Sequence, residues 1–370
     1  MEQKTMILAV IGVIAVICAG VGGWFLLQDD GPSEEGDITV TDMRGRTVEV
    51  PGEVDSIVCI SAGAVRMAVY MDAADMIVGV DDMDKGLKGP PVDSPRWSMA
   101  TYRLVLDTSQ LPCIGDHQNF KEIMETGADL IVTSETDVSD LDTLQRTTGI
   151  PVVAVRADGD INVDDSLFRE NVELLGKVLG KEKRAEELIS GIEGMVSDLR
   201  SKASKVVDRP EAYVGGMFFM MKGDMYTTTG NFIPFDLAGV SNVMPDKGGI
   251  PYDTNLKTLV ESGAEHMFID SINGKSSKQI FEADRATLQE LEAVRDGNIH
   301  SLFTYKFYGT NWESELMNAY YIGSLVNPDV YGKDWKSKVD GVLELFYPGS
   351  GLDTDRVNQK QAPGASELDW

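Results

Sequence analysis

The sequence contains little cysteine, little histidine and few basic side chains. Three cysteines and three histidines occur in 370 residues, and 33 Lys and Arg stand against 60 Asp and Glu, giving a formal net charge of -27. A chain this acidic repels phosphate backbones, which excludes nucleic acid as a partner. Its cysteine and histidine spacings match no zinc site. Two of the three cysteines, Cys59 and Cys113, therefore either form one disulfide with each other or remain free thiols.

The common catalytic motifs are also missing. There is no G-x-S-x-G, no H-E-x-x-H, no P-loop, and no G-x-G-x-x-G after a predicted strand. The sequence therefore predicts a protein that is not an enzyme.

One long apolar run is present, at residues 6–27, with neither charge nor proline. It is long enough to cross a hydrocarbon core of about 30 Å. Lys4 precedes it and several acids follow it, which predicts a cytoplasmic N-terminus and an extracytoplasmic remainder. We therefore expect a single-pass anchor in the cell membrane over residues 1–28 and a polar linker over 29–36. A cleaved signal peptide ranks second and a lipoprotein attached at Cys18 third, because Ile17 occupies a position that lipid attachment reserves for a small residue.

A short segment occurs twice, NFKEIMETGADLIVTS at residues 119–134 and NLKTLVESGAEHMFID at residues 255–270. Asn, Lys, Glu, Gly and Ala coincide without a gap, and most other positions exchange similar residues. Each copy predicts an Asn N-cap, a short helix, a Gly at its end and a buried strand. The duplication predicts an α/β protein of two related lobes.

The remaining pattern sets the domain boundaries. A hairpin around Arg44 and Gly45 and alternating strands and helices predict a first lobe over residues 37–164. Residues 165–207 are helical in pattern and predict a connecting segment between the lobes. A second lobe is expected over 208–348, and the Gly-, Asp- and Gln-rich residues 349–370 predict a disordered tail.

Several segments, in this order, resemble one protein family. They are ITVTDMRGRTVEV, GEVDSIVCIS, IVGVDD, the G-D-x-x-N-F stretch leading to ADLIVTS, AYVGG, PFDLAGVSNVM and GTNWESELMNAYYIGSL. Together they resemble the extracytoplasmic solute-binding proteins of ABC importers for iron-siderophores, haem and cobalamin, archaeal members included. The resemblance implies two Rossmann-like lobes joined by a long helix, with ligand held between them.

The resemblance also implies a function. It makes the protein a receptor that delivers an iron chelate, haem or corrinoid to an ABC permease and its ATPase, with no permanently bound cofactor. An extracellular enzyme or a chelatase-like, cofactor-handling module on the same fold is the alternative, because fold alone does not fix function.

Ligands of open α/β sheets bind beyond the carboxyl ends of the strands, and loops add aromatic side chains there. His117 is the metal-ligand candidate. The alternative to a ligand-binding role is core packing for Trp312. For Met217, which lies in a Met-rich strand and turn, the alternative is adaptable packing. The full set of predicted ligand-binding residues is Ser61, Gly63, Trp97, Tyr102, His117, Gln118, Met217, Tyr226, Thr229, Asn231, Tyr305, Tyr308 and Trp312.

Members of the resembled family dock to the permease through one surface Glu on each lobe, near the start of the repeated helix. This sequence has Lys121 and Lys257 at those positions, with Glu125 and Glu261 one turn later. Either the permease presents acids to the lysines, or the two glutamates dock, or both Lys–Glu pairs are ordinary surface pairs.

Overall fold

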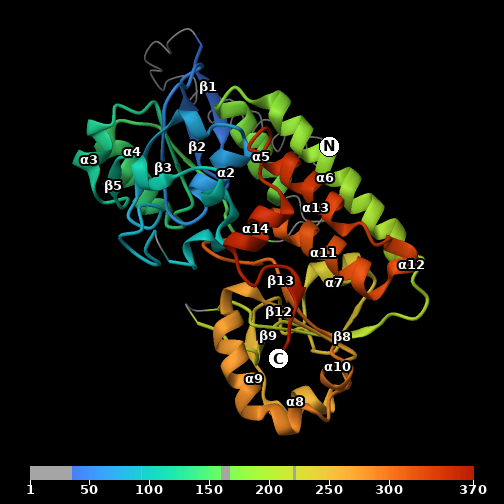
Figure 1. The fold of residues 1–370 in the computed structure, drawn as a ribbon. Coiled ribbons are helices and arrows are strands. Elements are labelled where there is room, and N and C mark those ends of the chain that lie inside the picture. Colours follow the sequence, from blue (N-terminus) through green and yellow to red (C-terminus); the bar gives the residue numbers. More distant parts are fainter. Residues whose placement is uncertain (1–35, 93, 160–166, 220–221) are drawn as a thin grey trace, which may run out of the picture.

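The computed structural model describes residues 36–92, 94–159, 167–219 and 222–370. These residues form two α/β lobes, each built on a five-stranded sheet (Figure 1). The predicted anchor, residues 1–28, and linker residues 29–35 lie outside this range. Among the described residues, no helix combines the length and the hydropathy that a membrane crossing requires.

The first lobe opens with a hairpin and continues as a parallel sheet. The hairpin pairs β1 (Ile38–Thr41) with β2 (Thr47–Val50), as predicted. The sheet has the order β5-β4-β3-β6-β7, with β3 (Ile57–Ile60), β4 (Ile77–Asp81), β5 (Cys113–Gly115), β6 (Leu130–Thr133) and β7 (Val152–Ala154). Its helices are α2 (Ala64–Tyr70), α3 (Phe120–Glu125) and α4 (Val138–Thr148), with 3-10 turns η1 (Ala74–Met76), η2 (Trp97–Met99), η3 (Thr101–Leu104) and η4 (Thr108–Gln110).

The register of this sheet decides between a disulfide and two free thiols. Cys59 on β3 lies opposite Val80 on β4, and Val80 lies opposite Cys113 on β5. Two strand spacings of about 4.8 Å put the two cysteines beyond disulfide reach. Both are free thiols.

Two helices connect the lobes. They are α5 (Leu167–Val178) and α6 (Glu182–Ala203), separated by Gly180 in a left-handed conformation with φ +61°. The 22-residue α6 packs on α5 at one end and on α7 of the second lobe at the other, and Figure 1 shows it leading from one lobe to the other. The single long helix implied by the resemblance is therefore α6, with α5 as a separate helix before it.

The second lobe is a mixed sheet of order β10-β8-β12-β13-β14, parallel except at β14, beside a small antiparallel pair of β9 with β11. Its strands are β8 (Glu211–Gly215), β9 (Thr227–Thr228), β10 (Ser241–Asn242), β11 (Tyr252–Asp253), β12 (His266–Asp270), β13 (Ile299–Leu302) and β14 (Ser366–Glu367). Its helices are α7 (Ile233–Ala238), α8 (Leu256–Glu261), α9 (Gly274–Leu288), α10 (Glu292–Arg295), α11 (Trp312–Val326), α12 (Pro328–Tyr331), α13 (Trp335–Phe346) and α14 (Thr354–Lys360), with the 3-10 turn η5 (Ser271–Asn273).

The repeated segment forms the same unit in both lobes, α3 to β6 and α8 to β12. Gly127 and Gly263 end the two helices with φ +65° and +72°. Asn255 caps its helix by accepting a hydrogen bond from the Thr258 N–H at 3.0 Å. Asn119 occupies the predicted N-cap position of α3, but its side chain makes no capping hydrogen bond and instead accepts from the N–H of Asp116 in the preceding turn.

The prediction that residues 349–370 are disordered is wrong. They form α14 and the edge strand β14, so the second lobe continues past residue 348. Val357 is buried in the main core, and the buried Gln361 hydrogen-bonds to both lobes. The polar composition misled because a few buried side chains and strand pairing suffice to order this segment.

Candidate functional site

Two strand ends of the first lobe meet at one position. The Ser61 N–H, after β3, donates to Asp81 Oδ2 at the end of β4, at 2.7 Å. The other Asp81 oxygen accepts from the N–H groups of Met83 and Asp84, both at 2.9 Å. Burial, with the charge of Asp84, raises the pKa of Asp81 to about 6. Asp81 thus organises the loops at the carboxyl edge of the sheet, where ligands of such folds bind.

Beside this edge lies an aromatic enclosure around Arg103. The guanidinium carbon is 3.9 Å from the Trp97 ring centre, 5.5 Å from that of Tyr102 and 5.0 Å from that of Tyr308 in the second lobe. Arg103 Nη2 pairs with Asp84 Oδ1 at 2.9 Å, and that oxygen also accepts from the Tyr102 hydroxyl. We call these five residues the Arg103 cluster.

Two polar atoms of the Arg103 cluster make no hydrogen bond. Arg103 Nη1 and the Tyr308 hydroxyl are buried and have no hydrogen-bond partner among the described residues. A buried donor without a partner costs about 1–3 kcal/mol, so such groups call for an explanation. A ligand site would leave such atoms at the junction of the lobes, although core atoms such as Trp312 Nε1 and the Tyr347 hydroxyl oxygen are buried without a partner among the described residues as well.

An arginine of the first lobe holds the wall that the second lobe contributes. Arg66, on α2, donates to the carbonyls of Tyr308 and Phe307, both at 2.7 Å, and to Asn311 Oδ1 at 2.9 Å. Tyr308 adopts a left-handed backbone with φ +53°, which is unfavourable for a bulky residue. The Arg66 bonds therefore fix the strained loop that places the Tyr308 ring over Arg103.

The structure brings part of the predicted set together. Gly63 lies against the Tyr308 carbonyl, where an added Cβ would be 3.4 Å away, and Trp97, Tyr102 and Tyr308 form the Arg103 cluster itself. Ser61 reaches the same loops through Asp81. Tyr305 and Met217 are buried in the adjoining core, where the Tyr305 ring meets that of Phe232 at 5.0 Å.

Other predicted residues lie in different surroundings. Trp312 is in the core rather than on a ligand wall, because its ring packs on Phe168 at 4.9 Å and is fully buried. The Tyr226 hydroxyl bonds to Asp284 on α9, and its ring packs on a separate core cluster. The Thr229 hydroxyl bonds to the carbonyl of Asn231, so this pair stabilises its own turn.

His117 and Gln118 form a separate polar group. The two His117 nitrogens lie 3.6 Å from Glu135 and 3.7 Å from Asp140, and Gln118 is 3.4 Å from Nε2. Within the described ranges, no three His, Cys, Asp or Glu side chains are grouped closely enough to hold a metal ion. A role for His117 as a metal ligand stays a prediction.

Sequence reasoning missed Arg66, Arg96, Arg103 and Asp84. One signal was available, since residues 85–106 contain four basic residues (Lys85, Lys88, Arg96, Arg103) and one acid (Asp93), a local charge of +3 in a chain of net charge -27. Arg96 also links the lobes, donating to Asn273 Oδ1 at 3.1 Å. Two of these four basic residues, Arg96 and Arg103, thus lie where the lobes meet, whereas Lys85 and Lys88 bond within the first lobe.

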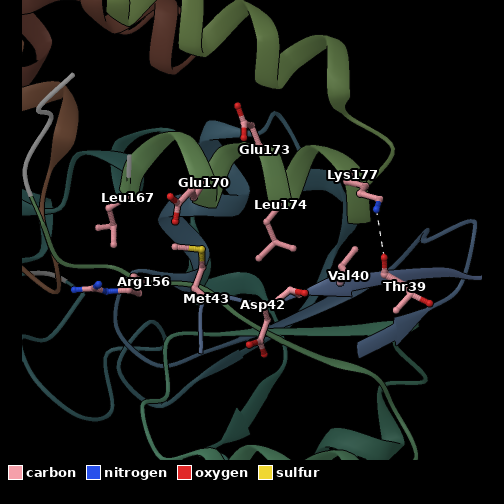
Figure 2. Close-up of a pocket in the computed structure, with 11 residues that line it drawn as sticks. Thr39, Val40, Asp42, Met43, Arg156, Leu167, Glu170, Glu173, Leu174 and Lys177 are labelled. Carbon is pink, nitrogen blue, oxygen red and sulfur yellow. Dashed lines mark hydrogen bonds between the residues drawn. The ribbon is translucent and has the colours of Figure 1, made fainter. Parts of the chain in front are cut away.

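A cavity of about 640 Å³ lies elsewhere, between the hairpin and α5 (Figure 2). Figure 2 shows Met43, Val40 and Leu174 facing one another inside it, with Glu170, Glu173 and Lys177 on the α5 side. Lys177 Nζ donates to the Thr39 carbonyl at 3.3 Å. No predicted ligand-binding residue lines this cavity.

Comparison with known proteins gives consistent results. The sequence profile of the family described as periplasmic binding protein matches residues 57–303. An uncharacterized ABC transporter substrate-binding lipoprotein of Bacillus subtilis (strain 168), YvrC, is 22% identical over 235 residues, covering 62% of this chain and 68% of that protein. A periplasmic solute binding protein of Veillonella parvula DSM 2008 superposes with a TM-score of 0.68 at 18% identity, covering 88% of this chain and 99% of that one.

A second structure, the molybdate periplasmic binding protein MolA of Haemophilus influenzae bound to molybdate, superposes with a TM-score of 0.65 at 17% identity, covering 86% of this chain and 100% of that one. At such identities the two solved structures establish the fold and leave the ligand of this chain open.

Proposed function

This chain belongs to the periplasmic binding protein family, whose members are substrate-binding proteins and not enzymes, and from that premise we propose that it captures an iron complex or a corrinoid between its lobes. The proposed partner is an ABC permease with its ATPase, which is consistent with the name of the Bacillus subtilis relative as an ABC transporter substrate-binding lipoprotein. The ligand is a ferric siderophore, haem or cobalamin-like molecule. The enzyme alternative is set aside because members of this family are substrate-binding proteins.

One observation carries the proposal: aromatic rings from both lobes meet around a single buried cation. Trp97 and Tyr308 are 6% and 9% exposed, so both rings are largely shielded from water. Aromatic walls with a few polar groups suit a large, rigid, partly apolar ligand. Because the walls come from different lobes, such a ligand would contact both.

Calorimetric titration with a ferric siderophore, haem and cobalamin tests the proposal, together with native mass spectrometry of protein purified from its own cells. Trp97→Ala and Tyr308→Ala should each weaken binding of the preferred ligand by about 1–3 kcal/mol. Trp335→Ala is the matched control, because that indole packs on Tyr321 instead. Equal affinity in all three variants would place the site elsewhere, and release of a chemically altered ligand would restore the enzyme alternative.

We propose that the repeated helices dock to the permease. Lys121 pairs with Glu125 at 3.6 Å on α3, and Lys257 pairs with Glu261 at 3.7 Å on α8. All four side chains are exposed to similar degrees in the two lobes. Matched charges on both lobes suit a permease with two-fold symmetry.

The docking proposal is tested in a reconstituted transporter. The double variant Lys121→Glu with Lys257→Glu should abolish ligand-stimulated ATPase activity without changing ligand affinity, and Glu125→Ala with Glu261→Ala tests the rival pair. Stimulation that survives in both double variants would leave ordinary surface pairs, worth only tenths of a kcal/mol.

We also propose that residues 6–27 anchor the protein to the cell membrane with both lobes outside. The lipoprotein nature of the Bacillus subtilis relative supports the extracytoplasmic location. The full chain should stay with membranes after a high-salt wash and retain its N-terminal peptide. Release by Cys18→Ala would instead support lipid attachment.

A further inference from the structure

We propose that residues 85–92 form a lid over the Arg103 cluster, which closes on Tyr308 through Gly89 and lifts to admit the ligand. The lid belongs to the first lobe, whereas Tyr308, the residue it closes on, belongs to the second. The inference rests on the proposed function, since the cluster that the lid covers is the proposed ligand site. It concerns how a ligand enters and leaves, whichever ligand is bound.

Two glycines bring the lid against the aromatic side chains of the cluster. A Cβ added at Gly86 would lie 3.2 Å from the Trp97 ring, and one added at Gly89 would lie 1.7 Å from the Tyr308 hydroxyl oxygen. Both glycines have positive φ, +75° and +98°, a conformation that residues with a side chain rarely adopt. The closed position therefore requires glycine at both places, and no side chain fits between Gly89 and Tyr308.

The lid begins at a fixed point. Lys85 Nζ donates to the carbonyls of Ser109 and Leu111 at 2.5 and 2.6 Å, and the Lys85 N–H donates to the Asp81 carbonyl at 3.0 Å. Gly86 follows directly, and glycine tolerates large changes of φ and ψ. Gly86 is therefore the hinge, and the residues after it are the part that moves.

The far half of the lid is held weakly. Gly89, Pro90 and Val92 make no hydrogen bond with any residue that the structure describes. Leu87 is 70% exposed, so its side chain adds little buried apolar surface. Segments with few buried contacts open at the lowest cost in free energy. Because Pro90 and Pro91 have fixed φ angles, this half is stiff and can lift as a unit.

The near half is held by exposed ion pairs. Lys88 Nζ lies 2.9 Å from Asp82 Oδ2 and 3.3 Å from Asp116 Oδ2, and the Lys88 side chain is 58% exposed. We call these three residues the latch. The N–H groups of Leu87 and Lys88 also donate to the Asp82 carbonyl, at 2.9 and 3.0 Å. Exposed ion pairs contribute little to stability and are screened by salt, so the latch opens readily.

Parting the two lobes would uncover the cluster at a higher cost. Arg66 makes three buried hydrogen bonds of 2.7, 2.7 and 2.9 Å to the second lobe. Asn311 Nδ2 of the second lobe donates to the Met99 carbonyl at 3.0 Å, and this bond is also buried. Breaking a buried bond leaves polar groups without partners, whereas the lid breaks exposed ion pairs and two backbone bonds. Lifting the lid is therefore the less costly route for a ligand.

The test combines one measurement without ligand and one with ligand, both on the full-length protein. Hydrogen exchange followed by mass spectrometry reports the opening of residues 85–92. Stopped-flow mixing with haem, ferrioxamine, a ferric tricatecholate and cobalamin reports the rates of association and dissociation. Lids commonly set such rates.

Two variants open the lid in different ways. Gly89→Ala places a Cβ against the Tyr308 hydroxyl, and Lys88→Met removes the latch. Lys88→Met changes an exposed side chain and keeps the test valid if Gly89→Ala fails to fold.

Each variant has a matched control. Gly149→Ala has a similar φ of +71° but open space around the added Cβ. Lys183→Met removes an exposed lysine that pairs with Glu187 on α6, at 3.8 Å.

We expect Lys88→Met to speed exchange in residues 85–92 by about 2- to 10-fold, the range that two exposed ion pairs allow. Salt at about 0.5 M should have the same effect on the native chain and little effect on this variant. Gly89→Ala should speed exchange by at least about tenfold, because the closed position is no longer available. Both variants should bind and release a probe faster than the native chain, and both controls should match the native chain.

The outcomes separate the lid from the receptor function. Faster exchange together with faster binding rates supports the lid, and so does a probe that binds Gly89→Ala but not the native chain. Unchanged exchange in both variants overturns the lid, as does faster exchange with unchanged binding rates, and the receptor function then stands if a probe binds. If no probe binds the native chain or either variant at millimolar concentration, the proposed function is contradicted and the lid has no ligand to admit.

Discussion

Replacing Arg66 with methionine tests how the two lobes are held together. Methionine keeps the aliphatic volume but removes three hydrogen bonds of 2.7, 2.7 and 2.9 Å that cross from α2 to the loop before α11. Each bond from a charged donor contributes about 1.5–3 kcal/mol. The three oxygen acceptors would also remain buried without a hydrogen-bond partner, which adds a desolvation cost. Methionine also removes the cost of burying the positive charge of Arg66, which offsets part of the lost stability. We therefore expect a net decrease of about 2–4 kcal/mol in the free energy of unfolding.

The assay is equilibrium unfolding in urea, with ligand titration as a second measurement. Arg146→Met is the control, because Arg146 is exposed on α4 and, within the described part of the chain, bonds only to Thr143 at 3.4 Å; its replacement should change the free energy of unfolding by no more than about 0.5 kcal/mol. The Arg66 variant should also weaken ligand binding, since the strained Tyr308 loop loses its anchor. A loss below about 1 kcal/mol together with unchanged affinity would refute the view that Arg66 joins the lobes and positions the site.

Three further predictions concern single positions. Gly63→Ala places a Cβ 2.6 Å from that of Ala157 at φ +89°, and should cost about 1–3 kcal/mol more than Gly127→Ala, which is left-handed but open, as chemical denaturation would show. Burial, with His266 nearby, lowers the pKa of His300 to about 4. Because the pKa of an unfolded histidine is about 6.5, the unfolded state binds more protons and the stability of the fold decreases as the pH drops from 6.5 toward 4. His300→Phe should therefore reduce the loss of melting temperature between pH 7 and pH 4.5. Gln361→Leu removes bonds to Ser98, Thr101 and Thr304 and should cost about 2 kcal/mol in urea unfolding, whereas an unchanged midpoint would mean that the tail does not bridge the lobes.

Sequence reasoning succeeded where the determinants are local. The hairpin turns at Gly45 with φ +76°, a conformation that glycine accepts readily, and both copies of the repeat form a helix, a left-handed glycine and a strand. These features depend on residues a few positions apart. The two-lobed α/β fold follows from them and is confirmed by the sheets.

It failed where contacts join distant parts of the chain. Arg66 bonds to residues more than 240 positions later, and no spacing rule indicates which arginine will meet which carbonyl. Trp312 carried an aromatic signal that suits a ligand wall or a core equally, and only the packing on Phe168 decides between them. Arg103 could have been predicted, because the local excess of basic residues over residues 85–106 can be read from the sequence alone.

Gln361 has a consequence for how the protein is made. Its amide bonds to the Ser98 carbonyl and to the Thr101 hydroxyl, which precede it by 263 and 260 residues and flank Trp97 and Tyr102. During synthesis the first lobe can fold early, yet the segment beside its aromatic residues cannot complete its hydrogen bonds until Gln361, about 260 residues later, has been made. Pairings this distant slow folding, so a nascent or truncated chain would contain a folded lobe and an unfinished site.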